Sequence, residues 1–255
     1  MKISIITVCF NSGETIKDTI DSVLSQDYKE IEYIVIDGLS KDNTLNILSA
    51  YKDEIAVTVS EPDEGIYDAM NKGIELATGD VIGILNSDDK FNGNSVISEV
   101  MDCFAASPDS VMVFGDVVYV DSLDTTIITR FYSAIKFRSW KLRFGWMPPH
   151  PATFIKKSIY DKVGVYSDKY RISADYEWFV RALLVYKLPF LHINKVLVRM
   201  RSGGVSTSGV RSSILLNSEI IKACRTNGVY TNFIFLTLKI PFKILELLKR
   251  PEGNS

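Results

Sequence analysis

Four short apolar segments, separated by stretches with helical spacing, most constrain the fold of this 255-residue chain. They cover residues 3–10, 32–36, 55–59 and 81–85. Apolar strands without polar alternation are typical of parallel sheets whose two faces are both covered by helices. The order β-α-β-α-β-α-β therefore predicts an α/β fold with a Rossmann-like, mostly parallel sheet flanked by helices.

Polar side chains follow each of these predicted strands. Asn11 comes after the first strand, Asp37 after the second, Asp63 after the third and residues 86–89 after the fourth. In open α/β sheets ligands bind beyond the carboxyl ends of the strands. These side chains therefore predict a ligand site at one edge of the sheet.

The second half of the chain has a different pattern. Residues 111–120 and 126–131 are expected to form a hairpin, residues 173–186 a helix and residues 190–201 another strand. A glycine- and serine-rich loop follows over residues 202–209.

Composition excludes several classes of protein. The net charge of −2 argues against a general nucleic-acid surface, and no nucleic-acid partner is expected. The three cysteines are far apart, so neither a disulfide framework nor a cysteine metal site is expected, and a reducing cytoplasm is the default. No dinucleotide fingerprint, P-loop or nucleophile elbow occurs, which argues against those enzyme classes.

The segment Asn-Ser-Asp-Asp at residues 86–89 places two carboxylates side by side at the end of an apolar strand. Hard cations such as Mg²⁺ and Mn²⁺ bind carboxylate oxygens, and a bound cation would remove the repulsion between Asp88 and Asp89. The alternative is a solvated turn, because Asn, Ser and Asp all favour turns.

Two further carboxylates have alternative interpretations. Asp37 could accept hydrogen bonds from a nucleobase or ribose, or belong to a simple turn before a helix. Asp175 could be a general base facing the site, or a carboxylate that stabilises the first turn of its helix.

The basic candidate residues also have two possible interpretations each. His150 stands between prolines, which fixes its direction, but packing alone would explain a histidine there. Arg199 and Arg201 are two residues apart, so both face one side of the last strand. They could bind a diphosphate through forked hydrogen bonds, or be solvated charges on an edge strand.

Six segments between residue 3 and about residue 205 carry a family resemblance in their order: ISIITVCFN, Asp37-Gly-x-Ser with Asp42-Asn-Thr, EPDEGIYDAMNKGIELATGD, LNSDD, HPATFIKKSIYDKVGVY and SADYEWFVRAL. Together they resemble glycosyltransferase family 2, whose members have the GT-A fold. The resemblance is closest to bacterial enzymes that build surface polysaccharides.

The resemblance implies a role for each candidate residue. Asp175 is implied as the catalytic base, Asp88 with Asp89 as metal ligands for Mn²⁺ or Mg²⁺, and His150, Arg199 and Arg201 as candidates for acceptor or diphosphate contacts. The implied donor and nucleotide contacts are Thr7, Phe10, Asn11, Glu14, Asp37, Asp63, Gly65, Asn71, Asn86 and Ser87.

This chain departs from the family pattern at two points. Asn86 stands where the family's metal motif more often has Asp, which leaves metal affinity and donor choice open. Some relatives carry a metal-binding His after the last strand, whereas residues 199–206 contain none. Arginine or the loop is therefore expected to help neutralise the diphosphate.

The implied activity is inverting, metal-dependent transfer of a sugar from a nucleotide-sugar donor, with UDP expected, to a hydroxyl of a glycan or lipid-linked acceptor. Two alternatives remain. One is a non-catalytic nucleotide-sugar sensor or assembly partner, and the other, less favoured, is a nucleotidyltransferase.

The expected organisation is a catalytic domain over residues 1–205 and a loop with a helical tail over 206–255. The catalytic domain would divide at about residue 110 into a donor-binding half and an acceptor and base half. Residues 232–250 are apolar with a mostly cationic stripe, which suits a membrane interface, packing on the enzyme's own core or a homodimer seam. The expected location is cytoplasmic, with contact to the inner membrane surface left open.

Overall fold

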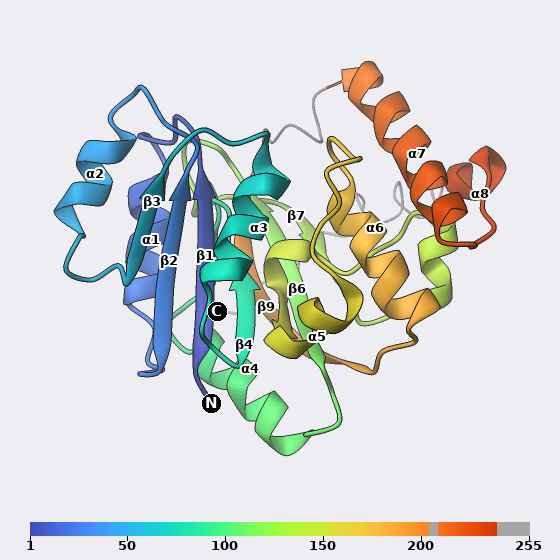
Figure 1. Cartoon of the computed structure of the whole chain (residues 1–255), viewed down its shortest axis with the longest axis horizontal. Helices are drawn as coiled ribbons and strands as arrows, with labels where there is room; N and C mark the ends of the chain where they lie inside the picture. Colours follow the sequence, from blue (N-terminus) through green and yellow to red (C-terminus); the bar gives the residue numbers. More distant parts are fainter. Residues whose placement is uncertain (204–208, 239–255) are drawn as a thin grey trace.

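The computed structural model describes residues 1–203 and 209–238 (Figure 1). The N-terminal half alternates strands and helices as predicted, and adds a short strand and a helix after the fourth predicted strand. Its elements are β1 (Ile3–Cys9), α1 (Ile16–Leu24), β2 (Ile31–Asp37), α2 (Thr44–Ala50), β3 (Val57–Ser60), α3 (Ile66–Leu76), β4 (Val81–Ile84), β5 (Lys90–Phe91) and α4 (Val96–Ala106).

The C-terminal half contains the predicted hairpin, helix and strand and helices in the predicted tail, together with shorter elements that sequence patterns did not indicate. Its elements are β6 (Met112–Val120), β7 (Ile128–Tyr132), η1 (Ser139–Phe144), η2 (His150–Ala152), β8 (Thr153–Lys156), α5 (Lys157–Val163), α6 (Ala174–Val180), η3 (Arg181–Val185), β9 (Phe190–Arg201), α7 (Gly209–Thr226) and α8 (Phe233–Thr237). The predicted helix over 173–186 is confirmed as α6 and its π-helical continuation η3.

Among the described residues, nine strands join into one sheet in the order β3-β2-β1-β4-β8-β6-β9-β5, with β7 paired to β6. The strands β3, β2, β1 and β4 are parallel, as the alternating pattern predicts. β6 and β9 are also parallel, whereas β5, β7 and β8 run antiparallel to their neighbours. The sheet therefore continues across the expected boundary near residue 110.

Helices cover both faces of this sheet, and β1 shows why its sequence lacks polar alternation. Ile6 and Val8 belong to the hydrophobic cluster that contains α3, α5 and α6. Ile3 and Ile5 belong to the opposite cluster, which contains α1 and α4. Both faces of the strand are buried, so both need apolar side chains. The α/β fold with helices on both faces of the sheet is confirmed.

The beginning of the C-terminal tail packs on the body of the protein. Ile220, Ala223 and Cys224 of α7 and Leu236 of α8 are buried in the same cluster as α6. Residues 239–250 of the predicted membrane stripe lie outside the described residues. Within the described ranges, no helix combines the length and hydropathy needed to cross a bilayer.

Candidate active site

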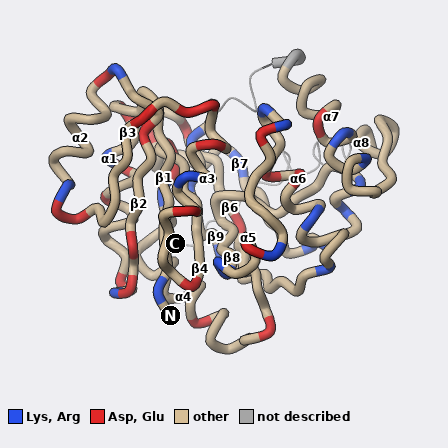
Figure 2. Tube along the Cα trace, viewed as in Figure 1, with Lys and Arg blue, Asp and Glu red and all other residues tan. Residues whose placement is uncertain are grey.

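A cleft of about 1860 Å³ opens at the carboxyl ends of β1 and β4. These strand ends point toward the top of Figure 1. The starts of α1, α3 and α6 and the segment between η1 and η2 form the other walls of the cleft. Figure 2 shows that acidic residues gather along this upper edge, near β3 and α3. Thirteen of the predicted site residues line the cleft: Phe10, Asn11, Glu14, Asp63, Gly65, Asn71, Asn86, Ser87, Asp88, Asp89, His150, Asp175 and Arg201.

The segment that follows β4 brings two carboxylates to the floor of the cleft. Asp89 is only 2% exposed, and Asn86 Nδ2 donates a hydrogen bond to its Oδ2 atom (3.2 Å). Burial raises the pKa of Asp88, and burial together with the charge of Asp88 raises the pKa of Asp89 well above its ordinary value. A buried carboxylate next to a second, half-buried one is costly to ionise without a cation, because burial and the neighbouring charge both oppose it.

The same segment offers oxygen atoms that fit a divalent cation. Asn86 Oδ1 is buried and has no hydrogen-bond partner among the described residues. With the carboxylates of Asp88 and Asp89, it forms a set of hard oxygen donors of the kind Mg²⁺ and Mn²⁺ prefer. No group of three or more His, Cys, Asp or Glu side chains suited to a metal occurs in the described part of the chain. Substrate phosphates and water would therefore have to complete the coordination.

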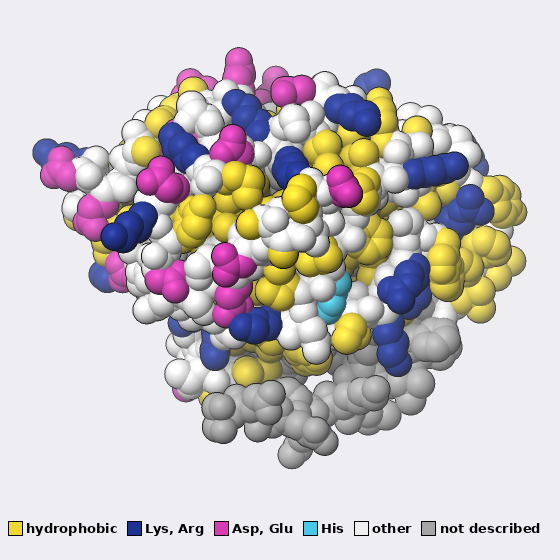
Figure 3. All heavy atoms as spheres, turned by 90° about the horizontal axis from the view of Figure 1, so that it is seen from below, with side chains coloured by type: hydrophobic (Ala, Val, Ile, Leu, Met, Phe, Trp, Pro, Cys, Tyr) yellow, Lys and Arg dark blue, Asp and Glu magenta, His cyan; other side chains and the backbone are white. Residues whose placement is uncertain are grey.

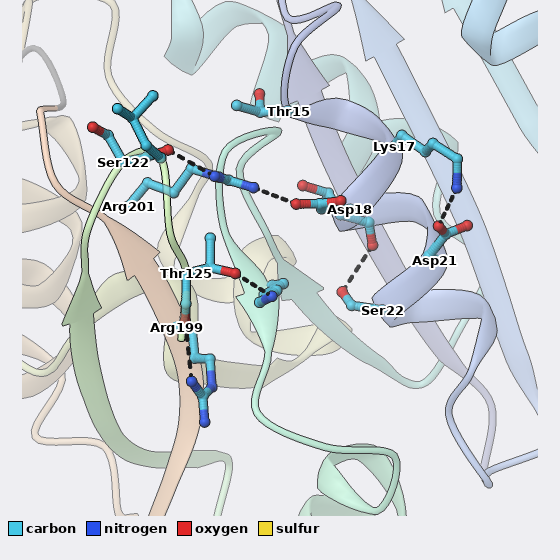
Figure 4. Close-up of polar contacts among 12 residues, drawn as sticks. Thr15, Lys17, Asp18, Asp21, Ser22, Ser122, Thr125, Arg199 and Arg201 are labelled. Carbon is cyan, nitrogen blue, oxygen red and sulfur yellow. Dashed lines mark hydrogen bonds and ion pairs between the residues drawn. The ribbon is translucent and has the colours of Figure 1, made fainter. Parts of the chain in front are cut away.

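Arg201, the last residue of β9, supplies positive charge beside these acids. Its guanidinium donates to the carbonyl oxygen of Ser122 (2.9 Å) and pairs with the Asp18 carboxylate on α1 (Figure 4). Its charge offsets part of the rise that burial causes in the pKa of Asp88 and in the pKa of Asp89, and both remain raised. Arg201 thus lines the cleft beside the two carboxylates, where its guanidinium could also bind an anionic ligand.

Arg199 points to different partners, although it faces the same side of β9. Its Nε donates to Asn92 Oδ1 (2.7 Å) and its Nη1 to the carbonyl oxygen of Thr125 (3.2 Å), as Figure 4 shows in part. Arg199 does not line the cleft. Its guanidinium instead holds the loop between β6 and β7 against the residues that follow β5.

The loop after β1 forms the second wall of the cleft. Phe10 is 62% exposed, and Asn11 adopts a left-handed backbone conformation with φ of 50°. Asn tolerates this conformation better than most residues. Asn11 Oδ1 accepts a hydrogen bond from the Lys41 amide (2.8 Å), which joins the loops after β1 and β2.

Thr7 and Asp37 lie behind this wall and do not line the cleft. Thr7 is fully buried and accepts a hydrogen bond from the Tyr33 hydroxyl (3.1 Å). The fully buried carboxylate of Asp37 accepts bonds from the hydroxyls of Ser40 and Ser60. Their polar atoms are used inside the fold, and their predicted nucleotide contacts stay predictions.

The start of α3 contributes three predicted residues. Gly65 has φ of 121°, a conformation that side-chain-bearing residues rarely adopt, and its amide donates to Asp63 Oδ1 (2.9 Å). Asn71 bonds both backbone polar groups of Tyr166, with N···O distances of 2.9 and 3.0 Å. The contacts of Asn71 join α3 to the loop that leads to α6.

Asp175 lies in the first turn of α6 and faces the cleft. Its Oδ1 accepts hydrogen bonds from the Tyr67 hydroxyl (3.0 Å) and the Tyr176 amide (2.8 Å). Burial and the charge of Asp175 raise the pKa of Tyr67 well above its ordinary value, so this hydroxyl stays protonated and donates. Within the described ranges, no hydrogen bond reaches Oδ2, which leaves one oxygen for a substrate proton.

His150 lines the cleft and is linked to two tyrosine hydroxyls. His150 Nε2 is 2.9 Å from the Tyr166 hydroxyl, which is 3.2 Å from the Tyr160 hydroxyl. Burial lowers the pKa of His150, so the imidazole is neutral at pH 7. A neutral imidazole in this position can bind a hydroxyl but adds no positive charge.

Sequence patterns missed a further acidic residue in the cleft, Glu219 of α7. It is 8% exposed, and its carboxylate accepts hydrogen bonds from the amides of Arg171 (2.9 Å) and Ile172 (3.1 Å) and from the Ser173 hydroxyl (2.8 Å). These three residues lead directly into α6. The tail helix therefore holds the loop that leads into α6, the helix that carries Asp175.

We predict that Glu219→Ala lowers kcat between about 10- and 100-fold, because a small displacement of a reacting group can reduce the rate that much. The variant also leaves two amides without their acceptor, which costs about 1–3 kcal/mol for each buried group. KM for the donor should change little. Steady-state kinetics and thermal unfolding measure the two effects.

The isosteric variant Glu219→Gln should recover part of the loss, because its amide oxygen still accepts hydrogen bonds. Glu75→Ala removes an exposed carboxylate from α3 and is the matched control. A folded Glu219→Ala protein with the kcat of the wild type would show that the hydrogen bonds of Glu219 do not position Asp175.

Comparisons with known proteins agree with this geometry. The model of glycosyl transferase family 2 matches residues 4–174. An uncharacterized glycosyltransferase of Mycobacterium tuberculosis is 36% identical over 186 residues, which cover 72% of this chain and 69% of that protein. A PGL/p-HBAD biosynthesis glycosyltransferase of Mycobacterium bovis is 28% identical over 181 residues, covering 70% of this chain and 68% of that one.

Solved structures share the fold at lower identity. Residues 1–349 of S. aureus TarS, in complex with UDP-GlcNAc, superpose with a TM-score of 0.65 at 18% identity, covering 87% of this chain and 67% of that one. The mannosyltransferase PcManGT from Pyrobaculum calidifontis, in complex with GDP-Man and Mn²⁺, superposes with a TM-score of 0.62 at 14% identity. The match covers 98% of this chain and 81% of that one. The family match spans more than half of the residues. The chain therefore belongs to glycosyltransferase family 2 and is a glycosyltransferase with the GT-A fold.

Proposed function

We propose that the chain is an inverting, metal-dependent hexosyltransferase that moves a sugar from a nucleoside diphosphate sugar to an acceptor hydroxyl. The observation that carries this proposal is that Asp175 and the segment Asn86–Asp89 face one cleft at the carboxyl edge of the sheet. A base and a diphosphate site must share a cleft for direct displacement at the anomeric carbon.

In this mechanism Asp175 accepts the proton of the acceptor hydroxyl. The acceptor oxygen then forms a bond to the anomeric carbon from the face opposite the diphosphate. The bond from the anomeric carbon to the diphosphate oxygen breaks, and a single displacement inverts the configuration. Tyr67 and the Tyr176 amide hold Asp175 through Oδ1, so that Oδ2 can take the proton.

Asp88, Asp89 and Asn86 would hold Mn²⁺ or Mg²⁺. Such a cation stabilises the negative charge of the leaving diphosphate when it is bound. Arg201 adds positive charge on the same side of the cleft and is kept in place by Asp18. Phe10, Asn11, Glu14, Asp63 and Gly65 line the part of the cleft assigned to the nucleotide.

Relatives support the choice of substrates. UDP-GlcNAc and GDP-Man occupy the two solved neighbours, and UDP is the nucleotide we favour. A glycan or lipid-linked glycan is the proposed acceptor, since one relative is named for biosynthesis of PGL/p-HBAD. Lipid-linked acceptors would place the enzyme in the cytoplasm at the inner membrane surface, in polysaccharide biosynthesis. Residues 1–205 would form the catalytic domain.

A thermal-shift screen of nucleoside diphosphates and nucleotide sugars, with and without Mn²⁺, tests this function. A UDP-sugar at about 100 times its Kd should raise Tm by about 5–10 °C, because ligand binding to the native state stabilises it by about 2.7 kcal/mol. Without Mn²⁺ the shift should shrink or vanish.

Product analysis then separates the alternatives. Release of UDP with a glycosylated acceptor supports a transferase, whereas release of pyrophosphate would indicate a nucleotidyltransferase. Donor binding without turnover of any acceptor or of water would indicate a nucleotide-sugar sensor. Absence of binding by every nucleotide would contradict the proposal.

A further inference from the structure

Apolar side chains are exposed together on one surface outside the cleft. Trp140 is 55% and Ile234 is 70% exposed, although both are large apolar residues. Figure 3 shows hydrophobic side chains at the right-hand end of the molecule, where α8 lies, with Lys and Arg beside them. We call this surface the basic–aromatic face. It consists of two segments, residues 135–143 with η1 and residues 233–238 with α8. Its members are Ile135, Lys136, Arg138, Trp140, Lys141, Arg143, Phe233, Ile234 and Leu238.

Stacked rings join the two segments of this face, which are far apart in the sequence. The rings of Phe144 and Phe235 stack at 4.8 Å with an angle of 3° between their planes. Trp140 packs edge-on against Phe144 at 5.6 Å. The Thr231 hydroxyl donates to the carbonyl oxygen of Arg143. The two segments η1 and α8 therefore present one connected surface.

Positive charge surrounds the exposed rings, and acids are absent from both segments. No Asp or Glu occurs between Asp124 and Asp161, nor over residues 220–238. The exposed cations are Lys136, Arg138 and Arg143, and the Lys141 ammonium lies over the ring of Trp140 at 5.9 Å. Figure 2 shows the chain beneath α8 with Lys and Arg and without Asp or Glu.

The basic–aromatic face borders the proposed active site. The residues directly after η1, from Gly145 to Pro151, line the cleft. Lys141 lies over the ring of Trp146, which is itself part of the cleft wall. A surface that bound η1 would thus lie next to the mouth of the cleft.

We propose that the basic–aromatic face docks on a bilayer surface rich in anionic lipids. Tryptophan favours the interface between lipid and water, and Lys and Arg bind anionic headgroups while their stems cover apolar surface. A symmetric contact with a second copy would bring like charges against each other. Docking would present the cleft to a lipid-linked acceptor, and this consequence rests on the proposed function.

Co-sedimentation of the full chain with vesicles tests the docking. We expect binding to vesicles that contain phosphatidylglycerol, little binding to phosphatidylcholine alone, and release by salt, because electrostatic attraction is screened. The variant Lys136→Glu/Arg138→Glu should weaken binding by at least about tenfold. Trp140→Ser/Ile234→Ser should weaken it as well.

The control Lys29→Glu/Lys52→Glu makes the same change in net charge at exposed positions of the N-terminal half and should bind as the wild type does. Hydrolysis of a UDP-sugar without vesicles should be unchanged in the face variants, which separates failed docking from a failed proposed function. Equal binding by face variants and wild type would overturn the proposal. So would light scattering that shows a wild-type dimer which the face variants dissociate.

Discussion

Replacing Asp175 with Asn is expected to lower the transfer rate by at least about a thousandfold and to leave donor binding nearly intact. General bases contribute about 10²–10⁴-fold to enzymatic rates. The amide keeps an Oδ1 that can accept from Tyr67 and the Tyr176 amide, so the geometry of the α6 start should persist. It cannot take a proton from the acceptor hydroxyl. The measurements are nucleotide release with saturating acceptor, and donor affinity by calorimetry.

A matched control lies in the same cleft. Asp168 is an exposed carboxylate that lines the cleft and carries no role in the proposed mechanism. Asp168→Asn removes the same charge and should keep most of the activity. Turnover of Asp175→Asn at the wild-type rate would exclude Asp175 as the base, whereas equal losses in both variants would indicate a general effect of cleft charge.

The strands β1 to β4 could be predicted because each is largely defined by its own residues, whereas β5 has only two residues and no local pattern indicates it. β1, β2 and β4 consist mainly of buried apolar side chains, and the same holds for much of β6. β8 has only four residues and pairs antiparallel with both β4 and β6. Its extended conformation depends on partners that lie far away in the sequence, which no local pattern reveals.

Backbone position alone brings one group of predicted residues to the cleft, although their roles stay predictions. Asn86, Ser87, Asp88 and Asp89 line the cleft because β4 ends there. For Arg199 and Arg201 the spacing predicts one face, yet long side chains reach different partners, Asn92 in one case and Asp18 in the other. The position of the guanidinium of a long side chain depends on neighbouring residues that only the folded structure brings close.

The residues that hold Asp175 could not be predicted from local sequence. Tyr67 is 108 positions away, and Glu219 acts on a loop that precedes it by 46 positions or more. In the sequence Glu219 is one acid in a polar helix, and the tail was expected as a separate segment. Only packing of α7 against α6 reveals its contact.

The carboxylates Asp88 and Asp89 are expected to differ in their effects on stability and on cation binding. Asp88→Asn should lower the transfer rate by at least about a hundredfold, because it removes charge from the proposed site for the diphosphate cation. It should also reduce the rise in Tm that Mn²⁺ produces, since less binding energy stabilises the native state. Removal of the cation with EDTA should lower the wild-type rate to a similar degree.

Asp89→Asn should instead stabilise the protein when no cation is present. The Asp89 carboxylate is almost fully buried beside Asp88, so a neutral amide removes both the desolvation cost and the repulsion. A gain of about 1 kcal/mol would raise Tm by about 2–4 °C in a chain of this size. Asp53→Asn, at an exposed position of the N-terminal half, is the control and should change neither Tm nor its response to Mn²⁺. If Mn²⁺ raised the Tm of Asp88→Asn as much as that of the wild type, the cation would have to bind elsewhere. If Asp89→Asn had a lower Tm than the wild type without cation, the Asp89 carboxylate would stabilise the fold. We therefore expect that Asp89 lowers the stability of the cation-free enzyme, because no cation then compensates its buried charge. The charge becomes favourable only when cation and donor are bound.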